Sequence, residues 1–408
     1  MVLNLKYQIR LVIYIRKTSE ELNELCKKYN VSRLWSWSRF NTYHNSPFEY
    51  YLKYIKGADE DRQDCIYTVT GGMSHEIMEN LYLGNIKYED MDSEFEDAWM
   101  TAGIAELKFD RNDSEKNKKI ADKYYRNLKH FFNNHHTIPY KVEIERFISV
   151  LIGKNVFQGY IDVCFKDSDG CFNILDWKTS SIYKGGKALN ECGQLVVYAI
   201  GLHQMGVPYE KIKICWDFLK YVKVDCEQAN GKWTTREIDR CEMGNKLQTS
   251  VKMWLKKLGY ESELVEYLDM LAQTNDIKCL PEDVQAKYKF RDCIVYVDLT
   301  QDLIDRWVTD ITNTIDEIME KEEKYEAEKL INKENAEMIF FDTPEQVEKQ
   351  SYYFSTLCAY SPNLHKPYKK YLDALAAQQN SDDFFSGVGS NATKNNSNDE
   401  DLSWLDQL

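Results

Sequence analysis

Ile174-Leu175-Asp176-Trp177-Lys178-Thr179, together with Gly159-Tyr160-Ile161-Asp162 shortly before it, is the stretch that decides the fold. Polar and apolar residues alternate in it, as in β-strands, and the intervening sequence at 167–170, Asp-Ser-Asp-Gly, predicts a turn. Because successive side chains of a strand point to opposite faces, we expect Asp176 and Lys178 to share one face. The neighbouring strand brings Asp162 close, so two carboxylates and a lysine should meet beside an apolar hairpin.

This combination of side chains predicts a particular chemistry. Carboxylate oxygens suit a hard divalent cation such as Mg²⁺ or Mn²⁺. A lysine beside the cation can stabilise developing negative charge or orient a water molecule. Burying Asp162 and Asp176 in strands without a cation or partner would cost free energy. A structural salt bridge between Asp176 and Lys178 is the alternative. We therefore expect a site of metal-assisted hydrolysis, for which phosphodiesters are the natural substrate.

Further motifs accompany these residues in a fixed order along residues 32 to about 205. Upstream, an aromatic and serine-rich run at 35–43 is followed by Ser46-Pro47, and then by His75 after a Gly-Gly pair. Downstream, Gln194 and Tyr198 are spaced to share one face of a helix. In this order the motifs resemble the PD-(D/E)XK nuclease superfamily. They are most similar to its RecB-like branch, which includes recombination exonucleases and small CRISPR-associated nucleases.

The resemblance implies an α/β fold, in which a mixed central sheet flanked by helices carries helical N- and C-terminal elaborations. It also implies which groups hold the metal: His75, Asp162, Asp176 and the backbone carbonyl of Trp177. Lys178 is expected to contact the attacking water or the phosphate, and Gln194 and Tyr198 to organise the site and contact the DNA. For His75, a core or surface histidine is the alternative.

Other candidates depend on weaker patterns. The superfamily often has an acidic residue on its first core strand, so Glu143 or Glu145 is a candidate, although a solvated strand face explains them equally well. Arg33 and Arg39 could hold DNA phosphates while the aromatic residues of the same run, Trp35, Trp37 and Phe40, stack on bases. The alternative assigns at least two of the aromatic side chains to the core, which leaves the arginines as the better candidates.

The cysteines depart from the pattern of the RecB-like branch. That branch often carries an iron–sulfur cluster, with one cysteine in an N-terminal Cys-Pro and three near the C-terminus. Here Ser46 takes the first position, and only Cys358 remains near the C-terminus, with His365 as a substitute at best. A cluster needs about four thiolates, so we predict no iron–sulfur cluster. Ser46 instead predicts a capping box with Glu49, with proline at the first helical position.

Composition limits the remaining classes of protein. The 408 residues include eleven cysteines without a Cys-x-x-Cys pair, which indicates a reducing, cytoplasmic setting. No apolar run could span a bilayer, and residues 1–16 do not read as a signal peptide. The net charge of −14 is unusual for a nucleic-acid enzyme, but a local basic groove can bind phosphates on an acidic body.

The expected organisation has four parts, and the sequence predicts strands for the central one. The parts are an N-terminal extension at 1–31, a nuclease core at 32–240 with a helical insertion at about 85–136, a helical region at 241–378 and a disordered acidic tail at 379–408. The expected strands lie at about 141–151, 156–166, 171–179, 211–224 and 232–238. Residues 399–408 could dock on a protein partner through an apolar stripe, or act only as a solubilising tail.

Together these observations predict a Mg²⁺- or Mn²⁺-dependent deoxyribonuclease. Exonuclease action on single strands or duplex ends is the common role in the RecB-like branch, in recombination, repair or replication. A stand-alone nuclease of this size suggests a bacteriophage or mobile-element protein. One alternative is a CRISPR-adaptation-type nuclease, against which the missing cysteines argue. Another is an inactive DNA-binding scaffold, against which the joint presence of Asp162, Asp176 and Lys178 argues.

Overall fold

The computed structural model describes residues 16–107, 109 and 113–386 of the chain. The predicted docking peptide at 399–408 and most of the N-terminal segment at 1–16 therefore lie outside the described residues. The described chain forms two compact units. The first unit comprises residues 16–65, 147–159 and 300–386, and the second comprises residues 66–146 and 160–299.

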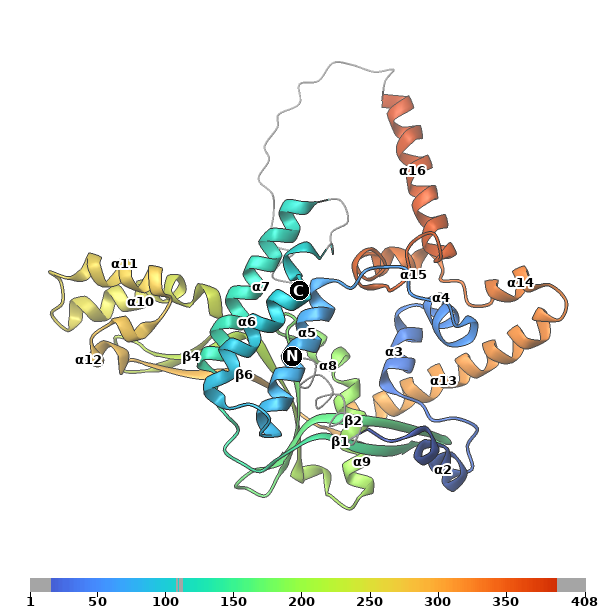
Figure 1. Cartoon of the computed structure of the whole chain (residues 1–408), viewed down its shortest axis with the longest axis horizontal. Helices are drawn as coiled ribbons and strands as arrows, with labels where there is room; N and C mark the ends of the chain where they lie inside the picture. Colours follow the sequence, from blue (N-terminus) through green and yellow to red (C-terminus); the bar gives the residue numbers. More distant parts are fainter. Residues whose placement is uncertain (1–15, 108, 110–112, 387–408) are drawn as a thin grey trace. The chain divides into compact units, whose positions relative to one another are not determined.

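All of the strands belong to one mixed sheet: β1 (Val142–Ile152), β2 (Asn155–Lys166), β3 (Phe172–Lys178), β4 (Ile212–Glu227), β5 (Trp233–Asp239) and β6 (Tyr288–Val297). The order is β1-β2-β3-β4-β5, and β6 pairs with β4 (Figure 1). The pairing of β3 with β4 is parallel, whereas β2 with β3, β4 with β5 and β4 with β6 are antiparallel. The boundary between the units falls within β1 and β2.

The helices of the second unit are α5 (Ile66–Tyr82), α6 (Met91–Ala102), α7 (Ser114–Asn134), α8 (Gly186–Glu191), α9 (Gly193–Gln204), α10 (Met243–Lys257), α11 (Leu264–Thr274) and α12 (Glu282–Gln285). Helix α9 connects β3 to β4 and packs against both. It is apolar almost all round, as expected for a helix buried against a sheet. This packing fixes the position of Gln194 and Tyr198 beside the end of β3.

Strand β4 is the longest strand of the sheet and has two differently paired halves. Its first half pairs with β3 along residues 212–218, and its second half pairs with β5 along residues 221–227. Strand β6 follows both halves on the other edge, across a register shift between Asp217 and Val222. Beyond this bulge, one face of the three strands packs on α10, α11 and α12 to form a hydrophobic core of its own.

The helices of the first unit are α2 (Ser19–Tyr29), α3 (Trp37–Asn45), α4 (Pro47–Tyr50), α13 (Gln301–Lys329), α14 (Lys333–Met338), α15 (Pro344–Lys349) and α16 (Lys366–Ser386), with π-helical segments at Tyr51–Lys56 and Tyr353–Leu357. Ser46 caps α4 as predicted, because its hydroxyl accepts from the Glu49 amide. The Glu49 carboxylate does not return this bond. It accepts instead from the hydroxyl of Tyr353 and the amide of Ala359, so the capping box is only half formed.

Ser46 also belongs to a fully buried polar cluster. Its hydroxyl donates to Asp342 Oδ2 at 2.9 Å and lies 3.0 Å from His365 Nε2. His365 Nδ1 accepts from the Tyr368 amide, so its proton is on Nε2 and is donated to Ser46. The serine and the carboxylate therefore lie on the same ring nitrogen, which is not the relay geometry of a hydrolytic triad. The cluster joins α4 to two C-terminal segments of the first unit.

The elements agree closely with the sequence predictions, with two differences. All five predicted strands are present, but β6 was not predicted and lies in the region expected to be helical. Its alternation of buried and exposed side chains is irregular, so the pairing with β4 determines it. Helix α16 runs to Ser386, into the expected tail. Among the described residues, no helix combines the length and the apolar character needed to cross a membrane.

Candidate active site

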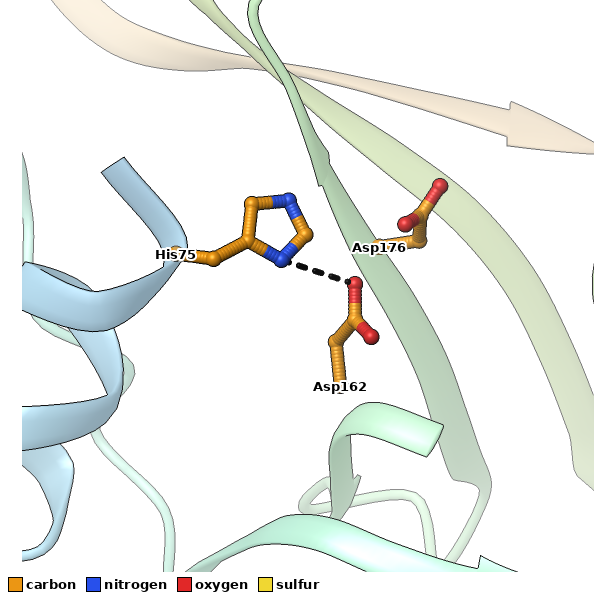
Figure 2. A group of neighbouring side chains, drawn as sticks. All are labelled: His75, Asp162 and Asp176. Carbon is orange, nitrogen blue, oxygen red and sulfur yellow. Dashed lines mark ion pairs between the residues drawn. The ribbon is translucent and has the colours of Figure 1, made fainter. Parts of the chain in front are cut away.

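Three predicted metal ligands come together in the second unit. His75 comes from α5, Asp162 from β2 and Asp176 from β3 (Figure 2). One ligand atom of each lies within 4.8 Å of the others. The two aspartates are adjacent because β2 and β3 pair directly, with Val163 opposite Leu175. His75 reaches them through α5, far away in the sequence.

The imidazole of His75 is held in one orientation. Its Nε2 lies 2.7 Å from the backbone oxygen of Trp177, and its Nδ1 lies 3.4 Å from Asp162 Oδ2. When Nε2 carries the proton and donates to Trp177, the lone pair of Nδ1 points toward the carboxylates. Burial lowers the pKa of His75, although the negative charge of Asp176 partly opposes this shift. The lowered pKa favours the neutral ring that ligates metals. The resemblance implies that the Trp177 carbonyl is a metal ligand. In this structure the same carbonyl is the hydrogen-bond partner of His75.

The two aspartates are electrostatically coupled. Burial, reinforced by the negative charge of Asp176, raises the pKa of Asp162 well above its ordinary value. Burial also opposes ionisation of Asp176, but the charge of Lys178 and a hydrogen bond with Asp162 outweigh it and lower the pKa of Asp176. Without a cation, Asp162 therefore retains a proton at pH values where Asp176 is ionised.

A divalent cation fits this arrangement. Among the described residues, Asp162 Oδ2 is buried and has no hydrogen-bond partner. A cation beside it would satisfy this oxygen and would allow both carboxylates to ionise. The donor set of one imidazole nitrogen and two carboxylates suits magnesium or manganese.

Lys178 lies beside Asp176, as strand alternation predicts. Its ammonium is 2.7 Å from Asp176 Oδ2, so the salt bridge considered as an alternative is present. Although burial lowers the pKa of Lys178, the negative charge of Asp176 and the nearby Tyr183 raise it above its ordinary value. The side chain is therefore a permanent cation. It also lies close enough to Asp162 for their charges to interact, so the ion pair belongs to the site.

Gln194 and Tyr198 form a second pair at the site. The amide of Gln194 donates to the hydroxyl of Tyr198 at 3.0 Å, as their helical spacing predicts. Burial raises the pKa of Tyr198, and the negative charges of Asp162 and Asp176 raise it further. Tyr198 therefore keeps its proton and lies within electrostatic reach of both carboxylates.

The two candidate glutamates on β1 differ in their positions. Glu143 is exposed and pairs with Arg146 at 3.1 Å, as a solvated strand residue would. The charge of Glu145 instead raises the pKa of both Asp162 and Tyr198, so Glu145 faces the site. Its φ of 49° is in the left-handed region, which non-glycine residues adopt at a cost. This backbone conformation interrupts the expected alternation of the two glutamates.

The predicted DNA-binding arginines lie in the first unit, where both interact with Glu322. Arg33 makes a bidentate pair with this carboxylate, and Arg39 Nη2 lies 3.6 Å from it. Trp35, between the arginines in the sequence, and Phe40, directly after Arg39, are buried. The structure thus places two of the aromatic side chains in the core, the alternative considered from the sequence.

Tyr183 is a neighbour of Lys178 that sequence analysis missed. It follows β3 in a loop, packs edge-on against Trp216 and Phe218, and is hydrogen-bonded to Ser180. The charge of Lys178 lowers the pKa of Tyr183, although burial raises it more. No strand or helix period applies in a loop, so no signal in the sequence could have identified this residue.

The comparison with known proteins agrees with the geometry. The sequence model of the PD-(D/E)XK nuclease superfamily matches residues 34–329, which is most of the chain and includes every residue of the site. A search of curated proteins found no match. Members of this superfamily are nucleases that generally use divalent metals such as Mg²⁺. With two strand carboxylates, a lysine and a histidine assembled as described, the chain belongs to the PD-(D/E)XK nuclease superfamily.

Proposed function

We propose that this protein is a Mg²⁺- or Mn²⁺-dependent deoxyribonuclease of the RecB-like branch, and that it acts as an exonuclease on single strands or duplex ends. The observation that carries the proposal is the grouping of His75, Asp162 and Asp176 around a buried oxygen without a hydrogen-bond donor, with Lys178 beside it. Such a group binds a cation and places a fixed positive charge next to it.

Each side chain has a specific role in the proposed site. His75, Asp162 and Asp176 would hold the cation, together with the Trp177 carbonyl that the resemblance implies. When bound, the cation would polarise the scissile phosphate and lower the pKa of water. Lys178 contacts the attacking water or a phosphate oxygen and offsets the negative charge of the transition state. Tyr198, kept protonated by burial, can donate a hydrogen bond to the DNA strand. Gln194 fixes the orientation of that hydroxyl.

The biological setting is part of the proposal. The resemblance to the RecB-like branch supports a role in recombination, repair or replication, and an origin in a bacteriophage or mobile element. The use of cysteine supports a reducing, cytoplasmic setting.

We also propose that the protein carries no iron–sulfur cluster. Ser46 and His365, at two positions implied by the resemblance, are already hydrogen-bonded to each other and to Asp342. Anaerobic purification followed by iron and sulfide analysis tests this proposal. Stoichiometric iron with a visible charge-transfer band would refute it.

Cleavage of DNA tests the proposed activity. End-labelled linear DNA and unlabelled circular DNA, each single- and double-stranded, are incubated with Mg²⁺, Mn²⁺ or EDTA. We expect linear DNA to be shortened from its ends in either metal, and circular DNA to remain intact. Cleavage of circles would show endonuclease action, and cleavage in EDTA would refute the metal requirement.

Substitutions test the site itself. Asp176→Ala and Lys178→Ala should each reduce cleavage by at least about 100-fold, because each removes a charge next to the reacting phosphate. Asp169→Ala and Lys166→Ala remove the same charges from exposed positions of the same hairpin and should leave cleavage unchanged. Circular dichroism of all four variants verifies folding. Full activity of the first two would exclude this site.

A further inference from the structure

The sheet face that carries the candidate active site continues well beyond it. Asp176 is opposite Trp216 on β4, and Trp216 is opposite Val295 on β6. Direct cross-strand partners lie on the same face, as do alternate residues of one strand. Arg291 therefore lies on the same face as Val295, and hence on the face of Asp176 and Lys178.

Beyond the bulge in β4, this face is exposed. The opposite face packs on α10, α11 and α12, where Val222 and Val224 are buried. Figure 1 shows β4 and β6 running together toward these helices. We call the exposed side of β4, β5 and β6 along residues 223–227, 233–237 and 289–291 the ribbon face. The described helices of the second unit thus leave one side of this three-stranded ribbon uncovered.

Cations form the outer layer of the ribbon face. Arg291 pairs with Asp225 at 2.8 Å, and its side chain is 56% exposed against 20% for the carboxylate. Lys184, in the loop that follows Lys178, pairs with Glu237 at 3.0 Å. The Lys184 side chain is 71% exposed, whereas that of Glu237 is 27% exposed. The carboxylates are thus covered by their partners, and the ammonium and guanidinium groups face the solvent.

Together with Lys184 beside it, the ribbon face carries a small excess of positive charge on an acidic protein. Its cations are Lys223, Lys289 and Arg291, joined by Lys184 from the neighbouring loop, and its carboxylates are Asp225, Glu227 and Glu237. This local excess of positive charge contrasts with the net charge of −14 of the whole chain. A polyanion is therefore the partner with matching charge.

An exposed tryptophan adds a second feature. Trp233 on β5 lies opposite Glu227 on β4 and is 42% exposed. The ammonium of Lys289 lies 4.6 Å from the centre of the Trp233 ring. A large aromatic side chain beside lysines is the combination that binds single-stranded nucleic acid, because bases stack on the ring while cations contact the phosphates. The stacking surface of a duplex is closed, so this feature favours a single strand.

We propose that the ribbon face binds a single-stranded segment of the DNA substrate next to the nucleotides held at the active site. This inference deepens the proposed function and rests on it. The strand would run from Lys178 past Lys184 and Arg291 to Trp233. An enzyme built in this way holds long strands more tightly than short ones, without any change at the reacting phosphate.

Binding of fluorescent oligothymidylates of about 5 and about 20 nucleotides tests this inference, with fluorescence anisotropy measured in EDTA. The double variant Lys289→Gln/Arg291→Gln should weaken binding of the long oligonucleotide roughly tenfold. It should also reduce the slope of log affinity against log salt by about 1.4, or about 0.7 for each lost phosphate contact. Trp233→Ala should weaken the same binding roughly tenfold with the salt slope unchanged.

The matched control is Lys252→Gln/Lys256→Gln, which removes two exposed cations from α10 on the opposite side of the ribbon. This control should bind like the wild type, and cleavage of the short oligonucleotide in Mg²⁺ should be unchanged in every variant. Thermal unfolding followed by circular dichroism verifies that the variants are folded.

The outcomes separate this inference from the proposed function. If the wild type cleaves DNA and the ribbon variants bind the long strand as tightly as it does, the ribbon inference is wrong and the nuclease stands. If the wild type binds through the ribbon face but cleaves no DNA in either metal, the proposed activity is wrong. The inference would also be wrong if the α10 control lost as much affinity for the long strand as the ribbon variants do. It would equally be wrong if the ribbon variants lost more affinity for RNA or duplex DNA than for single-stranded DNA.

Discussion

A buried lysine outside the active site should lower the stability of this protein at neutral pH. The Lys220 side chain on β4 is 5% exposed, and its ammonium lies 3.9 Å from the ring centre of Tyr124 on α7. Asp239, the carboxylate whose charge acts on Lys220, pairs with Lys123 at 3.5 Å. Burial therefore lowers the pKa of Lys220 to about 7, and Asp239 offsets this effect only in part.

The sign of the pH dependence follows from this shift. The folded-state pKa lies near 7 and the unfolded value near 10.5, so the unfolded chain binds more protons between these pH values. The contribution of Lys220 to the free energy of unfolding therefore rises with pH through this window. From pH 7 to pH 9 the gain is about 2 kcal/mol, at about 1.36 kcal/mol for each pKa unit.

The test replaces the lysine with an apolar side chain of similar length. Lys220→Met should be more stable than the wild type at pH 7, because methionine has no charge to desolvate. That advantage should shrink by about 2 kcal/mol at pH 9. Urea unfolding of both proteins at the two pH values measures it. The difference between the proteins is needed because Asp217, whose pKa burial raises to about 8, gives the opposite slope.

A control variant makes this test specific. Lys118→Met removes a lysine from the exposed side of α7 and should show no pH-dependent difference from the wild type. An advantage of Lys220→Met that is the same at pH 7 and pH 9, or a loss of stability at pH 7, would refute the reasoning. Either result would mean that the ammonium is well solvated or paired in the folded protein.

Two further predictions concern the metal site and the polar cluster of the first unit. Mn²⁺ at about 100 times its dissociation constant should stabilise the wild type by about 2.7 kcal/mol in thermal unfolding, and Asp162→Asn should lose most of this gain while Asp169→Asn keeps it. Equal stabilisation of all three proteins would show that the cation binds elsewhere. Ser46→Ala should lower the free energy of unfolding in urea by about 2–4 kcal/mol. It removes a helix cap and also the hydrogen-bond partner of two buried groups, the carboxylate of Asp342 and the ring nitrogen of His365. Ser36→Ala, which removes the cap of α3 and an exposed contact with Ser38, should cost about 1 kcal/mol, and an equal cost for both would contradict the role of the cluster.

Local periodicity determined a large part of this protein. Strand alternation placed Asp176 and Lys178 together, and helical spacing placed Gln194 beside Tyr198. The five strands that the sequence predicts are present, and Ser46 caps the start of α4. These features follow from backbone geometry over a few residues, so the order of residues is enough to predict them.

Tertiary structure decided the features that depend on distant partners. Glu322, 289 positions from Arg33, neutralises an arginine that looked available for DNA. Strand β6 exists because β4 offers it a long edge, and its own pattern is too irregular to predict it. The left-handed backbone at Glu145 and the uncovered ribbon face likewise depend on packing between segments. Such contacts depend on the sum of many weak interactions across the folded chain, which no local pattern of residues records.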